Sequence, residues 1–199
     1  MTRRLLIALV ALAWLPLAGA AAAQSLPARA DDMALGRANA PVTVIEYASV
    51  TCPHCARWHA DVFPEFKRRF IDTGRVRFVF RELPTAPAPV AIAGFMIARC
   101  APADQYFGVI GDLMDEQQQI VQAPLERLTA IAGRHGLSRA QFEACLDSEA
   151  NAAAVQERAE AAIDAGVQGT PTFFVNGRQV ASGEAPLATL EAAIVAAER

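Results

Sequence analysis

The chain has 199 residues, of which 53% are hydrophobic and 20% are charged, and its formal net charge is −3. A chain of this length can form one domain with a sizeable core. Its slightly acidic balance, with no block of basic residues, argues against a nucleic acid as partner.

The first 23 residues have the pattern of a secretory signal peptide. Arg3 and Arg4 precede an apolar run that ends near Leu17, and small residues continue to Ala23, after which we place the cleavage site. The run is too short for a membrane span. Cleavage leaves residues 24–199, with 16 basic and 21 acidic side chains. We therefore expect an exported protein in the periplasm, where disulfides can form.

Three strands and one helix are predicted before residue 86. The strands are expected at 33–35, 42–47 and 76–80, and the second is rich in β-branched and aromatic residues. The helix is expected to run from 53 to about 70, where Pro64 should kink or divide it. This part of the chain has the pattern of an α/β protein.

The segment 86–166 is predicted to be helical, and β structure returns after it. Apolar spacing predicts helices at 90–100, 104–117, 124–135 and 150–165. A capping box at Ser138 begins another. Strands at 172–175 and 179–181 are joined by the hairpin signal Asn176-Gly177, and a last helix is expected at 186–198. This order predicts a thioredoxin fold with core segments 24–85 and 167–199 and a helical insert at 86–166.

Cys52-Pro53-His54-Cys55 stands between a predicted strand and a predicted helix, which is typical of a thioredoxin-like redox site. Pro53 suits the first helical position. Cys52 is then at the helix N-terminus, where free backbone N–H groups and the helix dipole favour a thiolate. His54 adds a ring donor that can also favour the anion, and Cys55 can resolve a mixed disulfide. A metal clip and a structural disulfide are the alternatives.

The Cys-Pro-His-Cys motif and the order of elements resemble the DsbA family of thiol–disulfide oxidoreductases. The resemblance covers almost all of residues 24–199. It implies an enzyme that introduces disulfides into unfolded exported proteins and is reoxidised by a DsbB-like membrane quinone reductase. It also implies a lowered pKa for Cys52 and no metal or organic cofactor.

The resemblance assigns roles to three further residues. Glu46, six residues before Cys52, would exchange a proton with Cys55; a solvated edge-strand carboxylate is the other interpretation. Pro171 would form a cis peptide bond that faces the cysteines, and Thr170 would present its backbone to an incoming peptide. Because disulfide isomerases also carry threonine here, Thr170 leaves the direction of electron flow open.

Cys100 and Cys145 lie on the apolar faces of two predicted helices. The resemblance and the oxidising compartment favour a structural disulfide between them, because some DsbA-like proteins carry a second bridge. The alternative is two buried free thiols.

Other functions remain open from the sequence. A disulfide reductase or isomerase is the nearest. Isomerases of the DsbC type have an N-terminal dimerisation domain, and the roughly 18 residues between the predicted cleavage site and Val42 favour a monomer instead. A copper- or zinc-handling protein could use His59, one helical turn after Cys55, although such a histidine is more often a helix-surface residue. A purely structural module is the third alternative.

Overall fold

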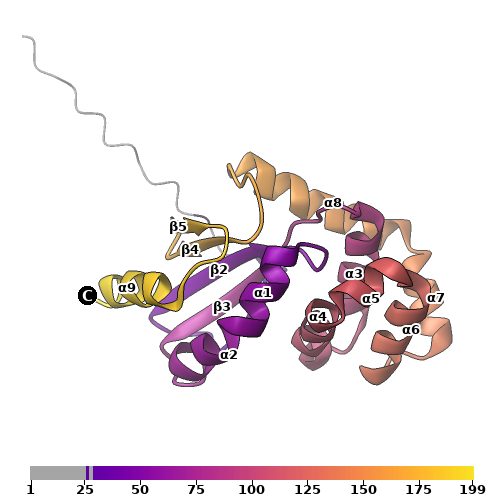
Figure 1. The fold of residues 1–199 in the computed structure, drawn as a ribbon, viewed down its shortest axis with the longest axis horizontal. Coiled ribbons are helices and arrows are strands. Elements are labelled where there is room, and N and C mark those ends of the chain that lie inside the picture. Colours follow the sequence, from indigo (N-terminus) through magenta and orange to yellow (C-terminus); the bar gives the residue numbers. More distant parts are fainter. Residues whose placement is uncertain (1–25, 27–28) are drawn as a thin grey trace, which may run out of the picture.

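The computed structural model describes residue 26 and residues 29–199, so the predicted signal peptide lies outside the described residues. Figure 1 shows a sheet with helices packed around it and a group of helices to one side. Within this described part, no helix combines the length and the apolar character that crossing a membrane requires.

The sheet has five strands in the order β1-β3-β2-β4-β5. Their bounds are β1 Met33–Leu35, β2 Val42–Ala48, β3 Val76–Glu82, β4 Thr172–Val175 and β5 Arg178–Ser182. The central strand β2 pairs parallel to β3 and antiparallel to β4. Its burial on both faces explains its continuous β-branched and aromatic sequence.

One face of the sheet carries the helix that follows the cysteine motif. This helix is divided, as the position of Pro64 predicted, into α1 Pro53–Asp61, α2 Phe63–Phe66 and a π-helical turn Lys67–Ile71. The last helix, α9 Leu187–Ala197, packs against β4 and β5. Trp58 of α1 joins Phe66 and Phe78 in the main core, which holds α1 firmly over β2 and β3.

Six α-helices form the segment between β3 and β4. They are α3 Ala88–Cys100, α4 Tyr106–Asp115, α5 Gln117–Gln122, α6 Pro124–Arg134, α7 Arg139–Leu146 and α8 Glu149–Asp164. A 3₁₀ turn, Ala103–Gln105, precedes α4. The helix expected over 104–117 was wrong in its extent, because Glu116 leaves helical geometry and α5 begins separately. The predicted thioredoxin fold with a helical insert is confirmed.

A buried carboxylate at the end of β3 attaches the insert to the sheet. Glu82 is fully buried and accepts hydrogen bonds from Arg99 of α3 (2.6 Å), from the hydroxyl of Tyr106 (2.9 Å) and from Arg158 of α8. A buried charge is tolerated only when it is paired and hydrogen-bonded in this way. Three helices of the insert are thereby held against one strand end.

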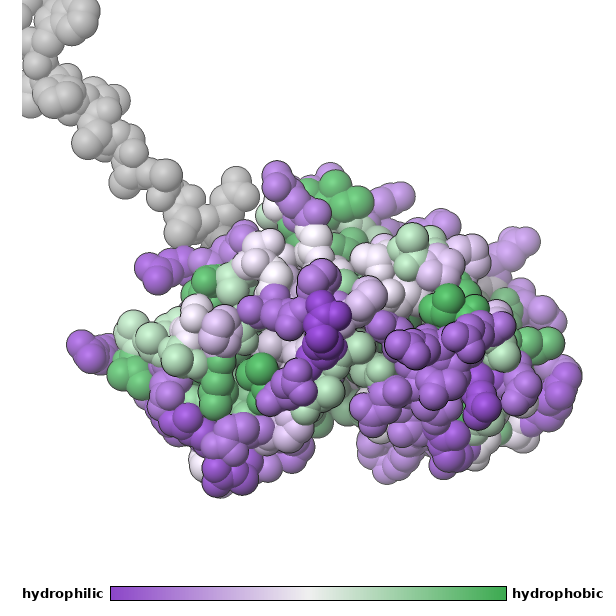
Figure 2. All heavy atoms as spheres, viewed as in Figure 1, coloured by the Kyte–Doolittle hydropathy of each residue, from purple (hydrophilic) through white to green (hydrophobic). Residues whose placement is uncertain are grey.

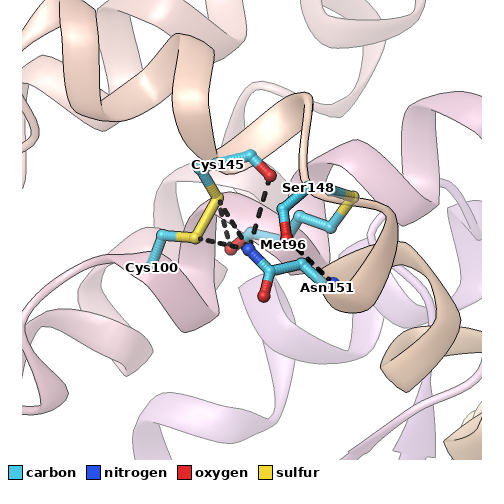
Figure 3. Close-up of a disulfide and its surroundings, with 5 residues drawn as sticks. All are labelled: Met96, Cys100, Cys145, Ser148 and Asn151. Atoms are coloured by element: carbon cyan, nitrogen blue, oxygen red, sulfur yellow. Dashed lines mark hydrogen bonds between the residues drawn. A yellow bond between two sulfur atoms is a disulfide. The ribbon is translucent and has the colours of Figure 1, made fainter.

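Cys100 at the end of α3 and Cys145 in α7 are joined by a disulfide bond (Figure 3). The bridge spans 45 residues of sequence. Asn151 of α8 lies beside it, with its amide nitrogen 3.4 Å from the Cys100 sulfur. The bond therefore links two helices of the insert at a point that α8 covers.

Candidate redox site

The loop between β2 and α1 is fixed by hydrogen bonds that its own residues supply. The Ser49 hydroxyl accepts the backbone N–H groups of Thr51 (3.3 Å) and Thr85 (3.1 Å), and Cys52 donates its N–H to the Ser49 carbonyl (3.1 Å). Cys52 is consequently the N-cap residue of α1, and Pro53 occupies the first turn. The sequence predicted both positions.

Cys52 is a free thiol with 7% of its surface exposed. Its sulfur lies 3.3 Å from the carbonyl oxygen of Thr170. The pKa of Cys52 is lowered from 9.0 to about 5, first by the hydrogen bond from the Cys55 thiol and then by Thr170 and the backbone N–H groups of Cys55 and His54. At neutral pH this group is a thiolate, which is the nucleophilic form of cysteine.

Cys55 is free and fully buried, and the backbone N–H of Ser49 points at its sulfur (3.5 Å). Burial is the main reason that its pKa is raised, and the hydrogen bond with Cys52 and the negative charge of Glu46 raise it further. The two thiols of the motif therefore differ in protonation. Cys52 is anionic and Cys55 keeps its proton.

Glu46 lies on the central strand, opposite Phe80 of β3 and Phe173 of β4. Its side chain is completely buried, so the edge-strand interpretation is wrong. One carboxylate oxygen, Oε2, lies 3.0 Å from Nε2 of His59, whereas Oε1 has no hydrogen-bond partner among the described residues. Glu46 is thus a half-satisfied carboxylate in the core beneath the cysteines.

His59 is not a helix-surface residue. Its side chain is only 8% exposed, and its ring packs against those of Trp58, Phe63 and Phe80. Helical spacing alone could not show this, because the insert covers that side of α1. Among the described residues, no group of three or more histidine, cysteine, aspartate or glutamate side chains is arranged to hold a metal ion.

The ring of His54 is directed at a carboxylate and not at Cys52. Nδ1 lies 2.6 Å from Oε1 of Glu184, and the Arg57 guanidinium contacts both side chains. The hydrogen bonds from His54 and Arg57 hold the pKa of Glu184 below its usual range, and the bond to His54 contributes most. The His54 ring therefore makes no contact with Cys52, and His54 favours the thiolate through its backbone N–H alone. The spacing of Arg57 from His54 is typical of a helical pair, but no local signal indicates Glu184.

Two distant segments complete the site. The peptide bond between Thr170 and Pro171 is cis, and this turn lies beside Cys52. Gln117 at the start of α5 donates to the carbonyl oxygens of Val50 and Cys52, at 3.0 Å each. The sequence indicated Thr170 and Pro171 through their resemblance to a known motif, but it gave no signal for Gln117.

A family model described as thioredoxin matches residues 28–195. A protein of Rickettsia conorii named as a protein-disulfide oxidoreductase is 33% identical over 168 residues, which are 82% of this chain and 59% of that protein. The chain thus spans about three fifths of that relative. Disulfide bond formation protein D of Bacillus subtilis is 27% identical over 154 residues, which are 73% of this chain and 68% of that one.

Among solved structures, alpha-DsbA1 of Wolbachia pipientis superimposes with a TM-score of 0.79 at 26% identity. The match covers 87% of this chain and 94% of that one. It therefore includes the helical insert as well as the sheet.

Proposed function

Because the chain belongs to the thioredoxin family, we propose that it is a DsbA-like disulfide oxidoreductase, an exported dithiol oxidase that acts on reduced, unfolded secreted proteins. The observation that supports this direction is the opposite shift of the two thiol pKa values, lowered for Cys52 and raised for Cys55. A stabilised Cys52 thiolate favours the reduced enzyme and so makes its disulfide more oxidising.

The proposed reaction starts from the Cys52–Cys55 disulfide. A substrate thiolate attacks the sulfur of Cys52, a new sulfur–sulfur bond forms, and the electron pair of the broken bond leaves on Cys55. A second substrate thiolate then attacks the substrate sulfur of this mixed disulfide. Cys52 leaves as a thiolate, and its low pKa makes it a good leaving group. The substrate has lost two electrons and the enzyme has gained them.

The groups around Cys52 suit an extended peptide as substrate. Thr170 and the cis Pro171 form the wall beside the sulfur, and we propose that the Thr170 backbone pairs with the peptide. Pro53 lies in the first turn of α1. A backbone N–H at that position has no partner within the helix, so a proline, which lacks the N–H, loses no hydrogen bond there. We further propose that a DsbB-like membrane quinone reductase reoxidises the dithiol. The protein would act as a monomer in the periplasm. During the reaction Glu46 would exchange a proton with Cys55.

A redox titration against glutathione tests the proposal. Trp58 is the single tryptophan of residues 24–199, and it lies in the core beside α1, so its fluorescence should report the state of the disulfide. An oxidase is expected to equilibrate well above the roughly −270 mV of thioredoxin, toward about −120 mV. A value near −270 mV would favour the reductase alternative.

A second assay measures how fast the protein forms a disulfide in a reduced peptide that has two cysteines. Cys52→Ser should abolish it. The double variant Cys100→Ala/Cys145→Ala keeps the motif intact and should retain it, because that bridge lies in the insert. A protein that rearranges the wrongly paired disulfides of a peptide, but does not oxidise a reduced peptide, would be an isomerase.

A further inference from the structure

We propose that Glu46 and His59 form a proton path that connects the buried Cys55 thiol with solvent in a pocket between α1 and α4. The inference rests on the proposed function, because each half-reaction there changes the protonation of Cys55. It adds His59 as a positioning residue that acts through Glu46, and it places the exit of the proton on the side of α1 facing the insert.

The thiol itself has no direct route to water. Cys55 is 0% exposed, and its thiol hydrogen-bonds to Cys52 on the side where the substrate would bind. A thiolate that forms there is strongly disfavoured, as the raised pKa of Cys55 shows. The protein must therefore deliver a proton to this sulfur when the disulfide opens and remove it when the disulfide forms again.

Glu46 and His59 are arranged as two successive carriers. The carboxylate is close enough to Cys55 for its charge to raise the pKa of the thiol. Its Oε1 has no protein partner among the described residues, while Oε2 meets His59 Nε2 at 3.0 Å. A carboxylate needed only for packing would be fully hydrogen-bonded. A carboxylate that carries protons needs one oxygen that is free to exchange a proton and another that is hydrogen-bonded to the next carrier. Glu46 has both.

The other side of His59 opens into a pocket of about 290 Å³. Phe63 of α2 and Phe107 and Gly111 of α4 are among the residues that line it. Figure 2 shows the corresponding apolar recess between the α1–α2 side of the molecule and the hydrophilic insert. A pocket of this size admits water, so the imidazole joins the buried carboxylate to solvent.

The charged and titratable groups that face His59 are few. They are Glu46 from β2 and Asp115 at the end of α4, which lines the same pocket. The rings of Trp58, Phe63 and Phe80 enclose the remainder of the imidazole. Protons therefore have a route through the carboxylate, the imidazole and the pocket, and Glu46 is the one titratable side chain of the described structure that hydrogen-bonds to the imidazole.

The proton balance is the same in both directions. When a substrate thiolate opens the disulfide, Cys55 leaves with the electron pair. One proton then passes from solvent in the pocket to His59, from His59 to the Glu46 carboxylate, and from the Glu46 carboxyl group to the Cys55 sulfur. When the enzyme is reoxidised, the Cys55 thiol loses its proton to Glu46, and His59 passes a proton to the pocket. His59 is seven residues beyond Cys52, about 10 Å along the helix, so bound substrate leaves this exit open.

The test measures a single turnover of the oxidised protein with a reduced peptide, stopped by acid and followed by mass spectrometry. Trp58 fluorescence is unsuitable, because its ring touches His59. We expect His59→Ala to slow disulfide transfer at pH 7 by about 10²-fold, the lower end of what positioned proton transfer contributes. Added imidazole should enter the pocket and raise the rate of the His59→Ala protein by at least about tenfold.

A second variant closes the pocket and leaves both carriers in place. A side chain added at Gly111 meets nothing within 4 Å, so Gly111→Leu should fill the space, slow the turnover and prevent rescue of His59→Ala by imidazole. Gly133→Leu is the matched control. It makes the same change on α6 at a glycine that also has free space, and its turnover should equal that of the unmodified protein.

The outcomes separate this inference from the function it rests on. A His59→Ala protein that turns over within twofold of the unmodified protein would overturn the path, as would imidazole rescue that survives Gly111→Leu. If His59→Ala does not fold, the Gly111→Leu arm still decides the question, with no slowing counting against the path. If the unmodified protein does not oxidise the peptide, the proposed function itself is wrong.

Discussion

The lowered pKa of Cys52 makes the stability of the reduced protein depend on pH. A thiol whose pKa falls from 9.0 in the unfolded chain to about 5 in the folded one stabilises the fold above the higher value. This stabilisation is lost as the pH falls toward the lower value. Between pH 6 and 8 the reduced protein should gain about 2.6 kcal/mol, since each unit of pH is worth about 1.36 kcal/mol in this range.

Solvent at the open side of the site screens the thiolate, so we expect between about half and all of this gain. The assay is urea unfolding of the reduced protein at pH 6, 7 and 8, compared with Cys52→Ala. Subtracting the two curves removes the contributions of all other titratable groups. Cys55 is present in both proteins, and its raised pKa keeps it protonated throughout this range.

The expected difference between the two proteins grows steadily with pH. A difference that stays constant from pH 6 to 8 would refute the reasoning, because it would mean that Cys52 has the same pKa in the folded and unfolded chains. A difference that shrinks with pH would mean that burial outweighs the hydrogen bonds to the thiolate. Alkylation of Cys52 by iodoacetamide as a function of pH gives an independent midpoint, expected near pH 5.

Three further outcomes follow from the contacts described above. Removing the carboxylate that contacts His54, by Glu184→Gln, should make the protein more oxidising by about two- to fivefold in its equilibrium with glutathione; an unchanged equilibrium would show that this pair has no influence on Cys52. Replacing both Cys100 and Cys145 by alanine should lower the free energy of unfolding by about 4 kcal/mol for a 45-residue loop, and a loss below about 1 kcal/mol in urea unfolding would contradict this. Glu82→Gln should cost about 3–5 kcal/mol, because two partly buried arginines lose the countercharge of a fully buried carboxylate; the same unfolding measurement checks it, and a neutral effect would show that the network is dispensable.

Local patterns in the sequence were sufficient for most of the fold. The capping box at Ser138 forms with Gln141 as predicted. The Asn176-Gly177 turn has positive φ at both residues, which this pair tolerates. The break near Pro64 also appears. Each of these features depends on residues within about four positions of one another, and such short-range preferences can be read directly.

The Cys52-Pro53-His54-Cys55 stretch shows both what the sequence predicts and what only the folded structure decides. From the sequence alone, Cys52 is placed at a helix N-terminus beside free backbone N–H groups, and Cys55 one turn later. The direction of the His54 ring depended on Glu184, which is 130 residues away in the chain. The position of a residue in a helix determines the helix face from which its side chain projects. The hydrogen-bond partner of that side chain depends on which segment of the chain packs against this face.

Burial was decided in the same way by the tertiary structure. His59 has the spacing of a helix-surface residue, yet the packing of α4 against α1 encloses it and leaves Glu46 as its partner. Gln117 reaches the motif only because α5 begins separately from α4. The sequence by itself determined the order of the elements and the position of the two thiols. The folded chain decided which groups surround them, since contacts between distant segments depend on packing and not on local preference.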